Sequence, residues 1–166
     1  MTTIVYANGV MAADRQLTSN GRRGLEVTKI FRNEAGDLAG VCGNATSITK
    51  LQAWFLDGEA EKLEIDEDSE VLVVRVDGTF EIHVEDGWFA SHGEYIAQGS
   101  GCEFAMGALA AGANVIEALR AAAKHDVHTG SAFNVLGHTD ELANALISEV
   151  SESDLEAQHG LSEAKH

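Results

Sequence analysis

Turn signals divide this sequence into short strand-like segments, and their arrangement constrains the fold more than any other feature. Four such turns lie between β-branched or aromatic runs: Asn8-Gly9, Glu34 to Asp37, Asp77-Gly78 and Glu85 to Gly87. Asn-Gly and Asp-Gly connections are typical of antiparallel hairpins, because both residues tolerate the left-handed backbone of a tight turn. The sequence therefore predicts antiparallel sheets.

The predicted elements run in the order strands, helix, strands, two helices, strand and helix. Strands are expected over 2–6, 10–14, 28–32, 38–42, 71–76, 79–84, 88–90, 95–98 and 132–136. Helices are expected from an N-cap at Asn44 to Gly58, and over 102–111, 114–125 and 139–150. An exposed loop is expected over 15–26, and a polar tail from about 151. Without strand-helix alternation, this order favours an α+β fold with two antiparallel sheets between helical layers, in one domain over 1–166.

The composition is that of a globular domain with a strong negative charge. Of the 166 residues 45% are hydrophobic, and 27 Asp and Glu against 11 Lys and Arg give a net charge of -16. Such a charge opposes binding to nucleic-acid phosphates or to anionic lipid surfaces. No secretory signal is visible at the start, and the longest uncharged stretch, Phe104 to Ile116, is too short to span a membrane. We therefore expect a soluble cytoplasmic protein that binds neither nucleic acid nor membrane.

The acidic stretch over 57–70 is predicted to be a solvated linker, because a run of like charges is usually exposed. The spacing of Asp66, Asp68 and Glu70 resembles part of a calcium-binding loop. Such a loop needs glycine at its sixth position, where this chain has Val71. We therefore expect no calcium site there.

The remaining metal-ligand residue types do not form a site pattern either. His125, Asp126 and His128 are too few, at one helix end, to define a metal centre. Cys42 and Cys102 lie far apart and match no zinc or redox spacing, which favours two thiols in a reducing compartment. No metal and no cofactor are expected.

Thr2 is the most informative position for chemistry. Removal of Met1 would leave Thr2 with a hydroxyl and a free α-amine on the same residue. An α-amine has a reference pKa of about 7.7 to 8.0, so near neutral pH it can accept the hydroxyl proton directly or through one water. A threonine in an edge strand is the alternative interpretation of this residue alone.

Six short blocks of sequence place Thr2 in a known context. They are Thr2 to Val5, Ala12 to Arg15, Lys29 to Arg32, Ala39 to Gly43, Gly99 to Gly101 and Asp126 to Gly130. In this order and spacing they resemble the signature blocks of proteasome β subunits and of HslV, their bacterial relative. The resemblance spans Thr2 to about Leu136 and implies an N-terminal nucleophile (Ntn) hydrolase with a four-layer αββα sandwich.

Carried over residue by residue, the resemblance places the nucleophile at Thr2, an acidic partner at Asp14 and a lysine at Lys29. A cation near the Thr2 amine would discourage that amine from binding a proton, and Asp14 would keep the lysine charged and in position. Alone, Lys29 is interpreted as a surface lysine on a strand and Asp14 as a carboxylate that caps a turn.

The resemblance also assigns supporting residues. The amide N–H of Gly40 is expected to point at the oxyanion formed during attack. Ser100, Asp126 and Thr129 are expected to hydrogen-bond the terminal amine and the nucleophile. Without the resemblance, Ser100 is a turn residue, and the other two are polar groups at a helix end.

Substrate specificity is expected from the residues around the first substrate side chain. The resemblance places these at Leu17, Val27, Leu38 and Cys42, which are all apolar. The resulting hypothesis is a threonine peptidase that cleaves peptide bonds after small or medium apolar residues.

The resemblance is incomplete after Gly43. Relatives commonly carry two long helices there, whereas this chain has one amphipathic helix followed by the acidic stretch. We expect a homo-oligomer, while ring size and an ATP-driven unfoldase partner stay open. Two other functions also stay open: a stand-alone amidase acting on a small metabolite, and a catalytically silent ring or assembly protein.

Overall fold

The computed structural model describes the backbone of residues 2–19 and 22–163 and the side chains of residues 2–18 and 25–154. The strands are β1 (Thr3–Ala7), β2 (Val10–Asp14), β3 (Gln16–Ser19), β4 (Arg22–Glu26), β5 (Ile30–Arg32), β6 (Leu38–Cys42), β7 (Glu70–Val74), β8 (Thr79–Val84), β9 (Gly87–His92), β10 (Tyr95–Gly99) and β11 (Phe133–Gly137). The helices are α1 (Ala45–Leu56), α2 (Cys102–Ala110), α3 (Val115–His125) and α4 (Asp140–Glu163).

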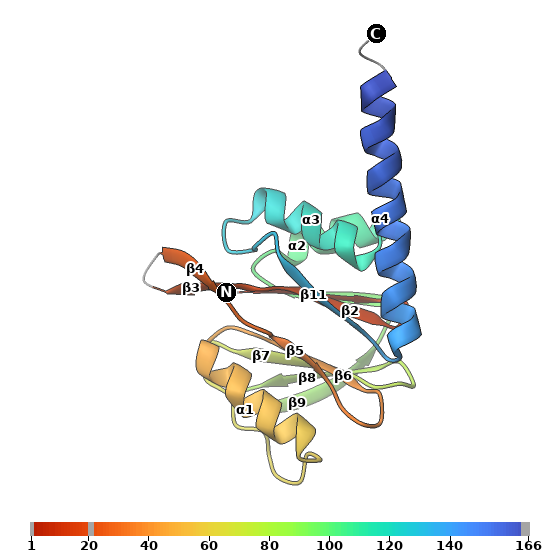
Figure 1. Ribbon diagram of the computed structural model, residues 1–166. Helices are drawn as coiled ribbons and strands as arrows, with labels where there is room; N and C mark the ends of the chain where they lie inside the picture. Colours follow the sequence, from red (N-terminus) through yellow and green to blue (C-terminus); the bar gives the residue numbers. More distant parts are fainter. Residues whose placement is uncertain (1, 20–21, 164–166) are drawn as a thin grey trace.

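Two antiparallel sheets form the centre of the molecule, as the turn signals predict. The first sheet has the strand order β10-β1-β2-β11, and the second has the order β5-β6-β7-β8-β9. In Figure 1 the helices α2, α3 and α4 lie on the outer side of the first sheet, and α1 lies on the outer side of the second. The predicted αββα sandwich is therefore confirmed.

The alternation of side chains along β1 explains why this strand is buried on both faces. Ile4 and Tyr6 join the cluster between the two sheets, with Met11 and Leu72. Val5 instead joins the cluster beneath the helices α2 and α3. Because successive strand residues point to opposite faces, a strand between two packed layers needs apolar residues at nearly every position. All five residues of β1 are accordingly buried.

The α1 helix covers the outer face of the second sheet. Asn44 caps its N-terminus by accepting a hydrogen bond from the Thr46 backbone N–H, as predicted. Leu51 and Phe55 are buried against Val71 and neighbouring strand residues in a third apolar cluster. Within the described residues, none of the helices has the length and apolar character required to cross a membrane.

Three segments differ from the sequence prediction. Residues 16–26 form the antiparallel hairpin β3–β4 instead of an irregular loop. The α4 helix does not end at Val150 but continues to Glu163. The acidic segment after α1 is more than a solvated linker, because Leu63 and Ile65 are buried against α1 and the second sheet.

Asp66 shows why the acidic segment is held in place. Its carboxylate accepts hydrogen bonds from Ser47 Oγ and Thr46 Oγ1 in the first turns of α1, and Lys50 Nζ lies 2.8 Å from the other oxygen. The hydrogen bond from Lys50, followed by those from the two hydroxyls, lowers the Asp66 pKa to about 2. Asp66 therefore ties the segment to α1.

No group of three or more potential metal-ligating side chains occurs in the part of the chain that the structure describes.

Candidate active site

The candidate site forms where the start of β1, the end of β2 and the end of β10 meet. Strand register brings these ends together, because Thr3 pairs with Gly99 and Ile4 pairs with Ala13. Asp14 therefore follows at the end of β2, opposite the first residues of the chain. Hairpin register thus assembles the site from residues far apart in the sequence.

Asp14 is a fully buried carboxylate with four hydrogen-bond donors. The backbone N–H groups of Thr3 and Gln16 each donate to it at 2.9 Å, and that of Gly130 donates at 3.2 Å. Lys29 Nζ donates at 3.1 Å. A buried charge is tolerated only when such donors replace water, so Asp14 fixes the first residue of β1 and the lysine at once.

Lys29 is one of the largest fully buried side chains, with 1% of its surface exposed. Its ammonium donates to Asp14 and, at 2.6 Å, to the backbone carbonyl of Gln16. Burial lowers the Lys29 pKa from its ordinary value, and the attraction to Asp14 opposes that shift. The alternative of a surface lysine is wrong. Lys29 is instead a buried cation close to the start of the chain.

A second network joins the remaining predicted polar residues. Ser100 Oγ and Thr129 Oγ1 each donate to Asp126 Oδ2 at 2.6 Å. Thr3 Oγ1 lies 2.6 Å from Thr129 Oγ1 and accepts from the Gly101 N–H at 2.9 Å. Since the single Thr129 proton is given to Asp126, the Thr3 hydroxyl donates to Thr129. A continuous chain of hydrogen bonds therefore runs from Gly101 to Asp126.

The Asp126 carboxylate has the character expected of the acceptor at the end of this chain. Partial burial acts to raise its pKa, but hydrogen bonds from Ser100, Thr129 and the His128 N–H outweigh burial and hold the pKa below its ordinary value. Asp126 therefore stays ionised and keeps both hydroxyls oriented.

Thr2 is held by its backbone beside this network. The Ser100 N–H donates to the Thr2 carbonyl at 3.1 Å. The adjacent Gly99 has a φ of +92°, and a Cβ at that position would lie 1.8 Å from the Thr2 oxygen. Only glycine combines this left-handed backbone with so close an approach. The turn after β10 thus sets the position of Thr2.

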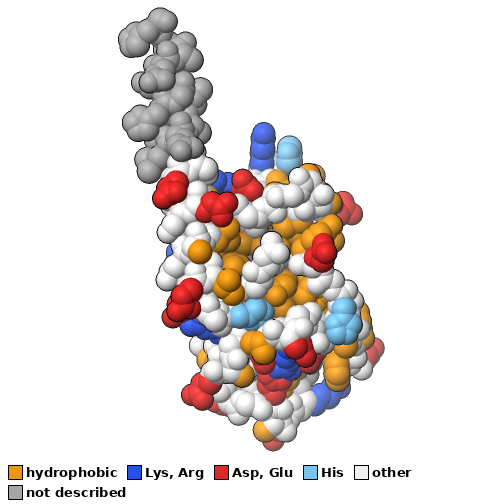
Figure 2. All heavy atoms as spheres, turned by 90° about the vertical axis from the view of Figure 1, so that its right-hand side faces the viewer, with side chains coloured by type: hydrophobic (Ala, Val, Ile, Leu, Met, Phe, Trp, Pro, Cys, Tyr) orange, Lys and Arg blue, Asp and Glu red, His pale blue; other side chains and the backbone are white. Residues whose placement is uncertain are grey.

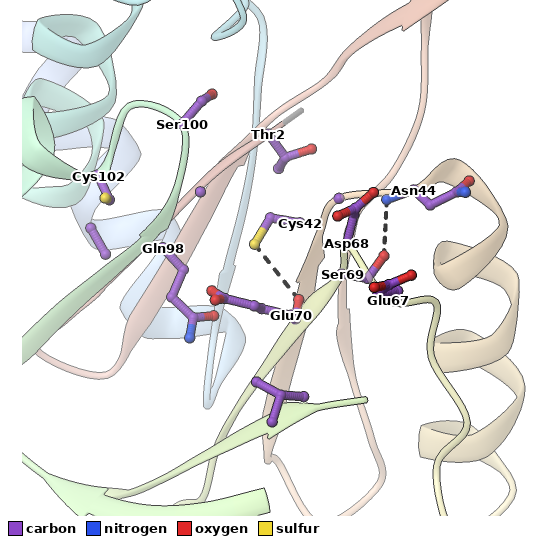
Figure 3. A pocket seen from close by; sticks show the side chains of 14 residues that line it. Thr2, Cys42, Asn44, Glu67, Asp68, Ser69, Glu70, Gln98, Ser100 and Cys102 are labelled. Carbon is purple, nitrogen blue, oxygen red and sulfur yellow. Dashed lines mark hydrogen bonds between the residues drawn. The ribbon is translucent and has the colours of Figure 1, made fainter. Parts of the chain in front are cut away.

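A pocket of about 880 Å³ opens beside Thr2 (Figure 3). Its described lining comes from the ends of the strands β6, β8 and β10 and from the acidic segment that leads into β7. The lining residues are Thr2, Cys42, Gly43, Asn44, Glu67, Asp68, Ser69, Glu70, Val84, Ala97, Gln98, Gly99, Ser100 and Cys102.

Of the two glycines in the block from Ala39 to Gly43, Gly43 lies at the pocket and Gly40 does not. Gly40 lies in the middle of β6, paired with Ile30 on one side and Leu72 on the other, and is packed against Ile4. Gly43 follows the end of β6 and lines the pocket with Thr2. At a φ of +114°, a Cβ on Gly43 would lie 2.2 Å from the Asp68 carbonyl. The geometry therefore does not fit the oxyanion role predicted for Gly40.

Of the four residues predicted to surround the substrate side chain, only Cys42 lines this pocket. Leu38 is fully buried in the cluster between the sheets, so it cannot contact a substrate there. Leu17 lies in β3 and Val27 directly follows β4, both outside the lining. Burial raises the Cys42 pKa to about 12, and its Sγ donates to the Glu70 carbonyl. Cys42 is thus a protonated thiol in the pocket wall.

Sequence reasoning missed Thr3 and Gln98. Thr3 contributes a buried hydroxyl to the Asp126 network, and Gln98 is a buried amide in the pocket wall. The signal for Thr3 was its strand alternation, because Thr3 and Val5 share the face toward the helices. For Gln98, a polar residue inside a short apolar strand was the available signal.

Many solved structures match this fold, among them the following three. BPH of Thiobacillus denitrificans in complex with epoxomicin gives a TM-score of 0.59 at 17% identity, covering 83% of this chain and 98% of that one. BPH of the same organism alone gives 0.58 at 18% identity, covering 84% and 98%. The eukaryotic HslV of Trypanosoma brucei gives 0.58 at 19% identity, covering 81% and 97%. No protein-family model and no curated protein sequence matches the chain. The chain therefore shares the HslV-type fold.

Proposed function

From the HslV-type fold and the arrangement around Thr2, we propose that this protein is a threonine-type peptidase whose nucleophile is the hydroxyl of Thr2. The supporting observation is the buried Asp14–Lys29 pair, which is bonded directly to the backbone of Thr3. A buried ion pair is costly to maintain unless its charges are well satisfied, and perturbed titratable groups tend to gather at functional sites.

The reaction begins after Met1 has been removed, when Thr2 carries a free α-amine. Thr2 Oγ1 attacks the substrate carbonyl carbon, and its proton passes to the amine as the new C–O bond forms. The C–N bond then breaks and the amine gives the proton to the leaving nitrogen. An ester to Thr2 remains. Water attacks this ester, its proton passes through the amine, and Thr2 Oγ1 is released as a hydroxyl.

Neighbouring groups have separate roles in this proposal. The Lys29 ammonium favours the neutral form of the Thr2 amine by charge repulsion, so the amine can act as a base near neutral pH. Asp14 holds Lys29 in place. The backbone N–H of Gly43 replaces that of Gly40 as the proposed oxyanion donor, because Gly43 lines the pocket with Thr2. Ser100, Asp126 and Thr129 orient the first residues of the chain.

The decisive experiment compares wild-type protein with Thr2→Ala. Intact mass should show that Met1 is absent, and Thr2→Ala should lower peptide hydrolysis at least about 1,000-fold, because it removes the nucleophile. Thr3→Ala is the matched control and should keep measurable turnover. Epoxomicin, which the BPH structure contains, should add its mass to the wild type and not to Thr2→Ala.

Three results would replace this proposal. Equal hydrolysis by wild type and Thr2→Ala would exclude Thr2 as nucleophile. A retained Met1 without turnover would favour a catalytically silent assembly protein. Hydrolysis of small amides without any peptide turnover would favour a stand-alone amidase with the same nucleophile.

We also propose self-association, supported by exposed apolar residues on the outer helices. They are Phe104 and Met106 on α2 and Leu142 and Ile147 on α4, each at least 36% exposed. Figure 2 shows hydrophobic side chains gathered on the face beside α4. Exposed apolar side chains that gather on one face are typical of association sites. Mass measurement of the native protein tests the proposal, and a strict monomer would contradict it.

An unfoldase partner and a cytoplasmic location stay predictions.

A further inference from the structure

The pocket beside Thr2 has a charge that the apolar-specificity hypothesis does not explain. Three carboxylates, those of Glu67, Asp68 and Glu70, belong to its lining. No lysine, arginine or histidine occurs among the described residues that line it. All three acidic residues are exposed, and none of them is buried against a cation. The potential inside this pocket is therefore negative.

Gln98 provides a second observation, independent of the carboxylates. Its side chain is buried, with 7% of the residue exposed, and it lines the same pocket. The amide oxygen is buried and has no hydrogen-bond partner among the described residues. Figure 3 shows the Gln98 side chain and that of Glu70 directed into the pocket. A buried acceptor without a donor is costly, so this oxygen is a candidate to receive a donor from a ligand.

The chemistry of these groups narrows the ligand. A glutamine oxygen and ionised carboxylates are all acceptors, so the complementary group carries N–H donors and positive charge. Lysine and arginine side chains have both properties at the end of an aliphatic stem. Cys42, Val84 and Ala97 supply apolar wall for such a stem. An acidic side chain would meet repulsion here, and an apolar one would leave Gln98 without a donor.

We propose that this pocket binds a lysine or arginine side chain of the substrate, at the residue whose carbonyl Thr2 attacks. The proposal rests on the peptidase function proposed above and defines its substrate class. Gln98 accepts one N–H of the bound cation, while Glu70 and Asp68 supply the countercharge. The protein therefore cleaves after basic residues.

The test uses fluorogenic peptides that differ only in the residue before the scissile bond: arginine, citrulline, lysine, leucine or glutamate. Citrulline has the shape of arginine without its charge. We expect kcat/KM for arginine to exceed that for citrulline and leucine about tenfold, the size of a charged hydrogen bond in a partly exposed site. Raising the salt concentration should shrink this ratio.

Variants locate the effect within the pocket. Glu70→Gln and Gln98→Met should lower the arginine-to-leucine ratio about tenfold while hydrolysis of the leucine peptide stays measurable. Glu64→Gln is the matched control, because Glu64 is an exposed carboxylate of the same segment outside this pocket. It should leave the ratio unchanged.

A binding measurement keeps the inference separate from the proposed reaction. Calorimetry with Thr2→Ala should show tighter binding of a peptide ending in argininamide than of one ending in leucinamide, and Glu70→Gln on this background should remove the difference. Thr2-dependent hydrolysis without a basic preference would overturn the inference and leave the peptidase intact. A preference confined to another substrate position would also overturn it. Preferential arginine binding without hydrolysis would support the pocket and count against the reaction.

Discussion

Lys29 and Arg75 are two cations that pair with carboxylates, and they differ in burial and in the number of carboxylates around them. Lys29 has a side chain 2% exposed and one carboxylate partner, Asp14, which three backbone N–H groups share. Arg75 directly follows β7 of the second sheet, and its side chain is 23% exposed. Its guanidinium contacts three carboxylates, those of Asp37, Glu59 and Glu81.

The difference appears in the pKa of each cation. Burial lowers the pKa of Lys29, whereas hydrogen bonds from Arg75 to Glu59 and Glu81 raise the pKa of Arg75. Arg75 is surrounded by excess negative charge and acts as a cross-link between loops and strands. Among the described residues, Lys29 pairs with one carboxylate, Asp14, which also accepts from the Thr3 N–H at the start of β1. Under the proposed function, Lys29 influences a neighbouring group, whereas Arg75 stabilises the fold.

The largest effect is expected from removing the shared carboxylate. Asp14→Ala leaves the Lys29 ammonium and three backbone N–H groups without their acceptor in a buried site, so the free energy of unfolding should fall by about 3–5 kcal/mol. Asp37→Ala is the counterpart at Arg75, which keeps two other carboxylates, and should cost about 1–3 kcal/mol. Urea unfolding of both variants measures the difference. Equal losses in the free energy of unfolding would contradict the claim that the Lys29 region depends more strongly on its carboxylate than the Arg75 region does.

A smaller effect, on catalysis, is expected from neutralising each cation. Lys29→Met keeps the side-chain length and removes the charge, so kcat/KM at pH 7 should fall about 100-fold, comparable to the loss of one stabilising donor. The acid limb of the pH profile should move to higher pH, because the Thr2 amine loses the cation that disfavours its protonation. Arg75→Met should retain near wild-type kcat/KM per folded molecule. An unshifted pH profile in Lys29→Met would contradict the role given to Lys29.

The smallest effect is expected in the pH dependence of stability at the Arg75 region. The hydrogen bond from Arg75 holds the Glu81 pKa below its ordinary 4.5. A carboxylate with a depressed folded-state pKa stabilises the protein above its unfolded pKa, and this stabilisation is lost as pH falls through the folded pKa. Arg75→Met should therefore be less stable than wild type at pH 7, and the gap should narrow below about pH 4.5. A constant gap from pH 7 to pH 3, measured by thermal unfolding, would show that Glu81 does not carry this contribution.

Much of the fold could be predicted because its signals are local. Asn8 and Gly9 have φ values of 51° and 79°, the left-handed turn that their sequence predicts. The Asn44 cap likewise marks the start of α1. The β3–β4 hairpin was missed because its Arg22, Arg23 and Gly24 lack the apolar alternation that identifies a strand.

The site was predictable only as far as residue types and order allow. Asp14 and Lys29 look like surface residues by type, and their burial depends on tertiary packing around β1 and β2. Gly40 and Gly43 belong to one sequence block, and only strand pairing shows which of them lies at the pocket. The hydrogen-bond state of Gln98 could not be inferred from its neighbours in the chain. Long-range contacts, rather than local pattern, decide these cases.

The close approach of Gly99 to the Thr2 carbonyl carries an evolutionary consequence. Because a Cβ at position 99 would lie 1.8 Å from that oxygen, any side chain there would push the first strand away from its neighbours. The proposed reaction therefore depends on a residue that has no functional group at all. Among descendants of a common ancestor, those that replaced this glycine should have lost turnover even where threonine, lysine and aspartate survive.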